Sequence, residues 1–229
     1  MTKNSAPTQG LCEFCKKPFA KSGMSRHLGA CSEYQARLLT PQGMTVDQLF
    51  HLLIEDRNNP SVYWMHLGVP GKSLLVDLDS FLRKIWLECC GHLSAFTIGD
   101  ERYSSSPLWE DDEKESNIEL KIEELLSPKL KFKYVYDFGS STHLQLKVHD
   151  IYPSPAMEEI LLLARNIAPV IPCSHCSDSA TRVCSCCQET LCMRCADIHT
   201  CSINYGSEVI LPLVNSPRSG VCGYASEYL

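Results

Sequence analysis

The sequence predicts an α+β protein, with a small mixed α/β core at residues 41–170 and a short cysteine-containing module on each side of it. Three observations predict this fold class. Apolar residues make up 44% of the 229 residues, as in an ordinary globular protein. The middle of the chain contains segments with helical periodicity and segments with the alternation typical of strands. Most of the 14 cysteines fall into groups, and the groups that contain C-x2-C pairs lie near the two ends.

Charge changes at the same boundaries. The formal charge is +4 for residues 1–40, −8 for residues 41–170 and −2 for residues 171–229, and the whole chain carries −6 with an isoelectric point of about 5.7. A chain with this balance is not expected to coat DNA or an anionic membrane surface. We therefore predict four parts: a first module at 1–40, the core at 41–170, a second module at 171–205 and a C-terminal tail at 206–229.

Hydropathy gives no sign of a membrane segment. The longest unbroken apolar run, residues 160–164, is far shorter than the roughly 20 residues that a membrane helix needs. The first eleven residues lack the apolar stretch of a secretory signal. We therefore expect a cytoplasmic protein without a membrane partner. In such a reducing compartment, closely spaced cysteines indicate metal ligands rather than disulfides.

The core contains one strong helical pattern. In residues 78–90 the apolar side chains recur every three or four positions, which predicts an amphipathic helix. Asp77 or Asp79 can cap its start, and Gly91 can end it. A second, short helix is predicted at residues 118–126.

Strands are predicted where apolar and polar residues alternate. Residues 131–139 and 142–152 are separated by a short link, which predicts an antiparallel hairpin. The apolar run within residues 158–166 lacks a polar helical face, which favours a buried strand. Residues 104–117 are polar and acidic and indicate a loop. Further strands are predicted at 61–69 and 92–99.

The first module contains four residues with the spacing of metal ligands. Cys12 and Cys15 form a C-x2-C pair, and His27 and Cys31 are four residues apart, so that a helix places them on one face. Two ligands from a tight turn and two from a helix give the tetrahedral geometry that zinc accepts. The pattern resembles the classical zinc finger, with Cys31 in place of the last histidine and a gap one residue shorter. We predict a closed structural zinc site, because so short a segment has almost no core without metal.

The first module is also basic, and Lys16, Lys17 and Arg26 are candidate contacts to nucleic acid. A single finger reads about three base pairs, and the acidic remainder of the chain repels phosphate. We therefore favour a docking or structural role for the finger. Nucleic-acid contact through the finger alone stays as the alternative.

The second module holds eight candidate ligands in four alternating pairs, as a two-zinc cross-brace requires. We expect the first and third pairs to bind one ion, and the second and fourth pairs the other. The spacing resembles the B-box zinc fingers and, more loosely, the MYND finger. A B-box usually ends in two histidines, whereas the last residue here is Cys201, and His175 or Cys186 remains an alternative for this position. The predicted ligands are Cys173, Cys176, Cys184, Cys187, Cys192, Cys195, His199 and Cys201.

The two modules together predict about three zinc ions in each chain. Sites closed by four protein ligands leave no position for a reactive water, so they favour folding and the presentation of a surface over hydrolysis. The B-box resemblance implies protein–protein interaction. The favoured function is therefore a non-enzymatic, zinc-binding interaction (adaptor) module with a protein partner.

The core carries motifs of a known family. Residues 131–148 read KFKYVYDFGSSTHLQLKV, and residues 78–103 combine the predicted helix with the segment HLSAFTI. Both are similar to motifs of the Ri-plasmid ORF-three-like domain family, which is related to passenger proteins of some insertion elements. Ser140 stands where that family usually has aspartate, and the aromatic residue that accompanies His143 is missing. The resemblance covers roughly residues 47–152, and it implies an α+β domain without an established activity.

His92, Asp137 and His143 are the polar residues that match the motifs of this family. One interpretation is a shared cleft with acid–base or binding activity, which would indicate an enzyme. The other alternative function is a nucleic-acid-associated factor of a mobile element that uses the basic N-terminal finger. We favour a structural interpretation, in which Asp137 caps the hairpin turn, since no serine or cysteine nucleophile is placed beside these residues.

Cys89, Cys90 and Cys222 lie outside the C-x2-C pairs. Cys89 and Cys90 end the predicted helix and are expected to be buried thiols. Cys222 has no partner nearby in the sequence, so we expect it to have no metal role. The tail that contains it is expected to pack back on the core.

Overall fold

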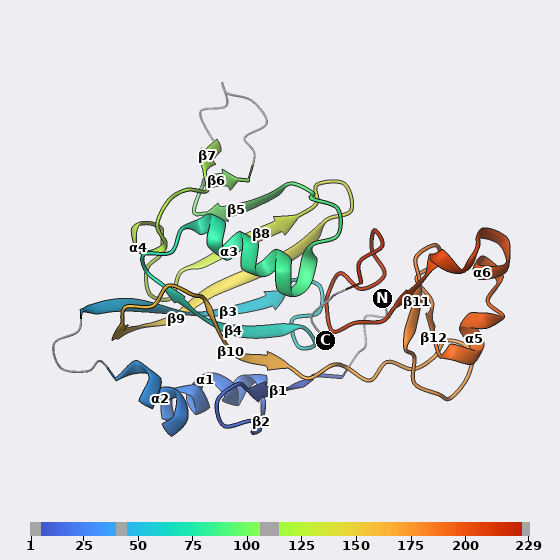
Figure 1. Ribbon diagram of the computed structural model, residues 1–229, viewed down its shortest axis with the longest axis horizontal. Helices are drawn as coiled ribbons and strands as arrows, with labels where there is room; N and C mark the ends of the chain where they lie inside the picture. The colour runs from blue at the N-terminus through green and yellow to red at the C-terminus, as the bar shows by residue number, and fades with distance from the viewer. Residues whose placement is uncertain (1–5, 40–44, 106–114, 226–229) are drawn as a thin grey trace.

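The computed structural model describes residues 6–39, 45–105 and 115–225, and it has the predicted α+β architecture. Its largest element is a ten-stranded sheet in the order β2-β1-β10-β4-β3-β9-β8-β5-β6-β7 (Figure 1), in which only the β6–β7 pair is parallel. The strands are β1 (Gln9–Cys12), β2 (Pro18–Ala20), β3 (Val46–Asp56), β4 (Trp64–Pro70), β5 (Ser94–Ile98), β6 (Glu101–Ser104), β7 (Glu115–Asn117), β8 (Lys131–Tyr136), β9 (Thr142–Pro155) and β10 (Leu161–Asn166).

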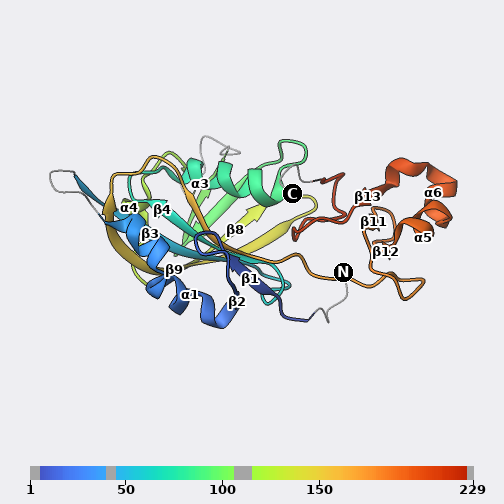
Figure 2. The same ribbon diagram turned by 60° about the horizontal axis from the view of Figure 1, so that its bottom comes forward.

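Helices lie against both faces of this sheet (Figures 1 and 2). On one face, α3 (Leu75–Leu82) continues into the π-helix η1 (Arg83–Leu87). On the other face lie α1 (Lys21–Ala30) and α2 (Ser32–Leu38). A further helix, α4 (Ile122–Leu125), consists of one helical turn and precedes β8 in the chain. Within the described ranges, no helix has the length and apolar character required to cross a membrane.

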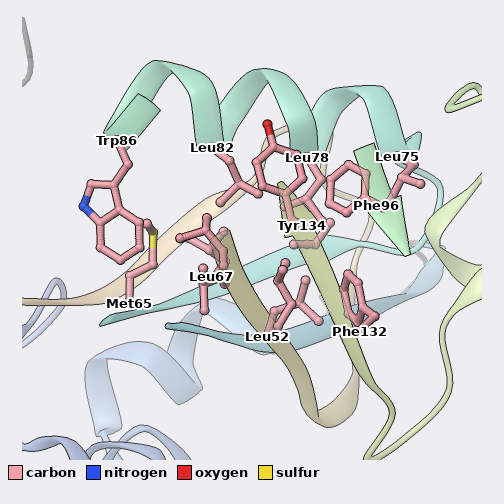
Figure 3. Close-up of a cluster of buried hydrophobic side chains, with 14 of the residues drawn as sticks. Leu52, Met65, Leu67, Leu75, Leu78, Leu82, Trp86, Phe96, Phe132 and Tyr134 are labelled. Carbon is pink, nitrogen blue, oxygen red and sulfur yellow. The ribbon is translucent and has the colours of Figure 1, made fainter. Parts of the chain in front are cut away.

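The main hydrophobic core lies between α3 and the sheet (Figure 3). Leu75, Leu78 and Leu82 recur at helical spacing and point toward the strands. Phe132 and Tyr134 alternate along β8 and project toward the helix, and all five side chains are buried. Burial of each large apolar side chain contributes about 1.5–3 kcal/mol, so this layer holds the helix on the sheet.

The helix predicted at 78–90 is shifted toward the N-terminus. It begins at Leu75, and the carboxylate of Asp77 accepts a hydrogen bond of 2.7 Å from the backbone N–H of Leu74. The helical turns end at Leu87, because the following residue takes an extended backbone with ψ of 124°. The last three predicted positions therefore belong to a turn, which matters for the cysteines that it contains.

The predicted hairpin forms between β8 and β9. Asp137 lies in its turn with φ of 65°, and its carboxylate accepts hydrogen bonds from the backbone N–H groups of Gly139 and Ser140 at 2.9 and 3.1 Å. Asp137 therefore has the turn-capping role that we favoured.

The remaining core elements follow the periodicity of the sequence. Of the acidic loop predicted at 104–117, residues 106–114 lie outside the described residues. The elements β4, β5, α4 and β10 lie at the positions predicted as 61–69, 92–99, 118–126 and 158–166.

The N-terminal module is joined to the core. Strand β1 pairs antiparallel with β10, so the module extends the main sheet instead of standing apart from it. Met24, Leu28 and Tyr34 of its two helices pack with Trp64 of β4 in a second hydrophobic core. A side chain on Gly10 of β1 would collide with the Trp64 ring, so this close approach requires glycine.

Two fully buried histidines lie on the same side of the sheet as this second core. His51 of β3 and His66 of β4 are joined by a hydrogen bond of 2.8 Å between Nε2 and Nδ1. Burial lowers the pKa of His51 to about 3, and burial also lowers the pKa of His66 well below its usual value. The ring of His149, whose centroid lies 4.9 Å from that of His51, adds repulsion against a second positive charge.

We expect both imidazoles to stay neutral in the folded protein at about pH 5. Histidine in an unfolded chain titrates near about pH 6.5, so the unfolded chain takes up protons before the folded chain does. The two buried, neutral imidazoles therefore do not lower the free energy of unfolding above about pH 6.5. As the pH falls from there toward the pKa values of the folded protein, proton uptake by the unfolded chain lowers the free energy of unfolding. Imidazole nitrogen chemical shifts of the metal-loaded protein measure the protonation state. A doubly protonated His51 or His66 ring in the folded protein at about pH 5 would contradict this prediction.

Candidate metal centres

Three C-x2-C pairs adopt the same kind of backbone turn, each in its own part of the chain. In the first, the N–H of Cys12 donates to the Lys17 carbonyl at 3.1 Å, and the N–H of Lys16 donates to the Cys12 carbonyl at 3.0 Å. The pair that begins at Cys184 repeats both bonds at 2.9 Å, and the pair that begins at Cys173 repeats the first at 2.9 Å. The shared turn positions the two sulfur atoms of each pair to contact one ion.

The N-terminal cluster contains Cys12, Cys15, His27 and Cys31, whose ligand atoms all lie within 4.8 Å of one another. Cys12 is the last residue of β1 and Cys15 lies in the turn after it, whereas His27 and Cys31 come from the end of α1 and the residue after it. The sulfur atoms of Cys12 and Cys31 are 4.0 Å apart, and Sγ of Cys15 lies 3.3 Å from Nε2 of His27. Phe19 stacks on the His27 ring at a centroid distance of 3.7 Å and fixes its orientation. The structure thus brings together the four residues that the spacing selected.

The C-terminal module contains two interleaved clusters, each with all ligand atoms within 4.8 Å. One joins the first and third cysteine pairs, and the other joins the second pair to His199 and Cys201, which is the alternation of a cross-brace. Cys186 is exposed and belongs to neither. The module contains β11 (Arg182–Cys184), β12 (Thr190–Leu191), α5 (Met193–Asp197) and α6 (Thr200–Tyr205). It extends past the predicted end at residue 205 to η2 (Ser207–Val209) and β13 (Ile210–Pro212), because β13 pairs antiparallel with β11. The clusters are Cys173, Cys176, Cys192 and Cys195 in one case, and Cys184, Cys187, His199 and Cys201 in the other.

His175, the other alternative for the eighth ligand, interacts with a carboxylate instead. Its Nε2 lies 3.0 Å from Glu189, and the same carboxylate lies 3.8 Å from Nδ1 of His199. His199 directs its other nitrogen, Nε2, toward Cys187 at 3.4 Å. At 3.8 Å the Glu189 carboxylate is too far from His199 for a hydrogen bond, so it acts on this imidazole by charge alone. No sequence motif singled out Glu189.

The distances inside the clusters fit a tetrahedral ion. With bonds of about 2.3 Å to sulfur and about 2.0 Å to nitrogen, tetrahedral zinc separates two sulfur atoms by about 3.8 Å, and sulfur from nitrogen by about 3.5 Å. The sulfur–sulfur contacts are 4.0 Å in the N-terminal cluster and 3.6 and 3.8 Å in the cluster that begins at Cys173. The sulfur–nitrogen contacts are 3.3 Å in the N-terminal cluster and 3.4 Å in the cluster that begins at Cys184. A disulfide requires about 2.05 Å. The three clusters can therefore hold metal ions.

Charge supports the same conclusion. Backbone N–H groups of His175 and Cys192 lower the pKa of Cys173 to about 6. The contact with Cys192 raises the pKa of Cys195, in the same cluster, to about 12. One thiolate thus forms readily and opposes the ionisation of its neighbours. A dication removes this opposition, because its charge stabilises all four thiolates together.

Of the three residues of the predicted cleft, the structure brings His92 and Asp137 together but not His143. Nε2 of His92 lies 3.7 Å from Oδ2 of Asp137. His143 follows Thr142 on β9, and Thr142 is buried against Arg218, the ion-pair partner of Asp137. Since successive side chains of a strand point to opposite faces, His143 faces away from this group. The cleft shared by the three residues is not formed.

Cys89 and Cys90 are not the buried thiols that we expected. Cys90 and Cys222 are exposed, and Cys89 is half-buried, because the helix stops before Cys89 and the chain turns toward the surface. The tail packs on the core as predicted, and it places Cys222 beside Cys90 and His92. These four side chains form another group whose ligand atoms lie within 4.8 Å.

Comparisons with known proteins concern the main sheet. The family model of the plasmid pRiA4b ORF-3-like protein matches residues 48–174, more than half of the chain. A crystal structure of a protein of unknown function from Methanosarcina mazei Go1 is similar over 55% of this chain and 73% of its own, with 18% identity and a TM-score of 0.47. No curated protein matches the chain. The matched residues run from β3 through β10 and include neither the N-terminal cluster nor most of the C-terminal module. The chain therefore belongs to the plasmid pRiA4b ORF-3-like family, as the motifs of its core predicted.

Proposed function

We propose that this protein is a zinc-stabilised interaction protein, in which three structural zinc ions shape the terminal modules and the C-terminal module docks a protein partner. Zinc is the ion of choice because each cluster combines thiolates, alone or with one imidazole, at tetrahedral distances. Each site would be filled by four protein ligands, so no position remains for a metal-bound water. The ions act on folding and on the shape of the surface, rather than on a reaction.

The exposed apolar surface of the C-terminal module is the observation that carries the docking function. Met193, Ile198, Ile203 and Tyr205 are 52%, 75%, 71% and 64% exposed, and all four lie on α5, α6 or the turn between them. These helices form the end of the molecule away from the main sheet (Figures 1 and 2). Large apolar side chains left exposed on so small a module favour a protein interface there.

A protein is the partner that this surface fits best. Residues 171–229 carry a formal charge of −2, and a zinc ion bound by four thiolates adds −2 more. Such a surface repels phosphate, and its exposed residues are aliphatic or aromatic rather than basic. Burial of two or three of these side chains at an interface supplies several kcal/mol of driving force.

The test compares two double variants by in-cell cross-linking and mass spectrometry. Ile198→Ser/Ile203→Ser changes the proposed surface, and Ile167→Ser/Val170→Ser changes exposed apolar residues outside it. Zinc content should stay the same in both, because none of the four is a cluster residue. We expect the first variant to lose a partner that the wild type and the second variant retain. Identical partner sets for all three proteins would overturn the proposed docking surface.

We expect no strong binding of nucleic acid at physiological salt. Lys16, Lys17 and Arg26 are all exposed, but Lys16 forms an ion pair of 2.5 Å with Glu13. Ten cluster thiolates (−10) and three zinc ions (+6) change the formal charge of the chain from −6 to −10. Screening over about 8 Å confines any benefit of the basic residues to direct contacts.

Fluorescence anisotropy at several salt concentrations measures this expectation. Weak binding should fall steeply with salt and should drop further when Lys16, Lys17 and Arg26 are changed to glutamine. The matched change of Lys131 and Lys133, two exposed lysines of β8, should have little effect. Nanomolar binding that is insensitive to salt would contradict the prediction and favour the nucleic-acid alternative.

A further inference from the structure

Two distant segments bring four potential ligands together beside the end of η1. Cys89, Cys90 and His92 come from one turn, and Cys222 comes from the C-terminal tail. The sulfur atoms of Cys90 and Cys222 are 3.9 Å apart, and Nε2 of His92 lies 3.3 Å from Sγ of Cys222. These separations lie within the range of the corresponding contacts in the other clusters, and they fit a tetrahedral ion rather than a disulfide.

The turn that carries three of the ligands is held by the core. The Glu88 carboxylate accepts a hydrogen bond of 2.6 Å from the N–H of Gly91, and another of 3.0 Å from the Tyr136 hydroxyl. The same hydroxyl oxygen accepts hydrogen bonds from the N–H groups of Cys89 and His92 at 3.4 and 3.3 Å. Gly91 has φ of 69°, a conformation that glycine allows without strain. The three side chains are thus oriented before any ion binds.

The segment before Cys222 is anchored to the same region. The hydroxyl of Ser216 donates a hydrogen bond of 2.6 Å to the carbonyl of Trp86, the residue before the last of η1. The Asn215 amide donates to the Asn166 carbonyl at 2.8 Å. Cys222 itself has φ of 51°, a left-handed conformation that is uncommon for a residue with a side chain. The tail adopts this conformation at the position that brings the sulfur atom of Cys222 to Cys89, Cys90 and His92.

Charged neighbours suit a metal–thiolate site. Arg218 is fully buried, and its Nη2 donates a hydrogen bond of 3.4 Å to Sγ of Cys89. Asp137 Oδ2, which binds the same guanidinium nitrogen at 2.7 Å, lies 3.7 Å from Nε2 of His92. Three thiolates with one dication leave a net charge of −1, and Arg218 faces that charge.

We propose that Cys89, Cys90, His92 and Cys222 form a fourth metal site, which takes Zn²⁺ or a similar divalent ion that prefers sulfur ligands. The site joins the tail to the turn after η1, across 130 residues of sequence. It is separate from the three clusters of the proposed function, because it shares no ligand with them.

This ion would couple the C-terminal module to the core. Two residues before Cys222, the Gly220 carbonyl accepts a hydrogen bond of 3.0 Å from the Gln188 side chain of the module. A side chain on Gly220 would come within 2.9 Å of Val183 of β11, so the tail passes close to the module at this point. The ion thus fixes one end of a short segment whose other end contacts the module.

The fourth ion should exchange more readily than the other three. Each of the three clusters contains at least two buried ligands, whereas Cys90 and Cys222 are exposed and the other two ligands are half-buried. Solvent and chelators therefore reach this site first.

The test counts metal ions in the full-length protein, purified under reducing conditions and reloaded with Zn²⁺. We expect four ions per wild-type chain, three for Cys222→Ala and three for His92→Ala. Cys186→Ala, which changes an exposed cysteine outside every cluster of the described residues, should keep four. Hydrogen exchange should become faster in residues 213–224 of Cys222→Ala, while the main sheet remains protected.

The outcomes separate this site from the proposed function. Three ions in both the wild type and Cys222→Ala would overturn the fourth site and leave the proposed function intact. Fewer than three ions in the wild type would count against the three structural sites. Peptide mapping without reductant detects a Cys90–Cys222 disulfide, and such a bond in the reloaded protein would also overturn the fourth site.

Discussion

Replacing Cys187 by serine will unfold residues 171–205 and leave the main sheet folded. Cys187 is one of four potential ligands in its cluster. The hydrophobic cluster of the module has Cys184, Leu191 and Ala196 as its buried members, which is too little to fix some 30 residues by itself. Structural zinc sites contribute about 10–16 kcal/mol of apparent binding energy in small zinc-dependent domains, and loss of a ligand removes much of it.

Hydrogen exchange with peptide resolution measures this result, together with the zinc content. Amide protection should disappear across β11, β12, α5 and α6, and should stay unchanged in β3, β4 and β9. The matched control is Cys186→Ser, the adjacent residue, which is exposed and lies outside the clusters. It should change neither the zinc content nor the protection. If Cys187→Ser or a chelator leaves the protection of the module unchanged, metal is not what folds it.

Features set by short-range spacing were predictable from the sequence. The periodicity of residues 78–90 indicated the helix of the main core, and alternation along 131–139 and 142–152 indicated the hairpin. The C-x2-C pairs and the His27–Cys31 spacing selected residues that the structure brings together, because a tight turn and one helical face fix the geometry of ligands so near in sequence.

Features that depend on tertiary contacts were not predictable in this way. The pairing of β1 with β10 joins segments separated by more than 150 residues, and the close fit of Gly10 against Trp64 is one of the tertiary contacts that accompany it. The group around Cys222 likewise depends on a tail that crosses the molecule. His51 and His66 are 15 residues apart and belong to different strands, and the register of β3 on β4 brings them together. A single sequence carries no local signal for such contacts.

Replacing Arg218 by leucine will destabilise the docked tail strongly. Its guanidinium is fully buried, and it binds Asp137 at 2.7 Å, the Ser140 carbonyl at 3.0 Å and the Thr142 hydroxyl at 3.1 Å. It also lies over the Tyr136 ring, 4.8 Å from its centroid. Removal of one member of a buried ion pair leaves the other charge without compensation, which costs about 3–5 kcal/mol. The free energy of unfolding of the zinc-loaded protein should fall by an amount in this range.

The exposed pair of Arg194 and Asp178 provides the matched control. Its atoms lie 2.5 Å apart, as close as the buried pair, but the Arg194 side chain is 80% exposed. Solvent screens such a pair, so Arg194→Leu should change stability by no more than about 1 kcal/mol. Asp137→Asn/Arg218→Leu should recover part of the loss, because it also removes the uncompensated carboxylate. Equal effects of Arg218→Leu and Arg194→Leu would show that burial of the Asp137–Arg218 pair does not anchor the tail, and that other contacts, such as that of Ser216 with the Trp86 carbonyl, are sufficient.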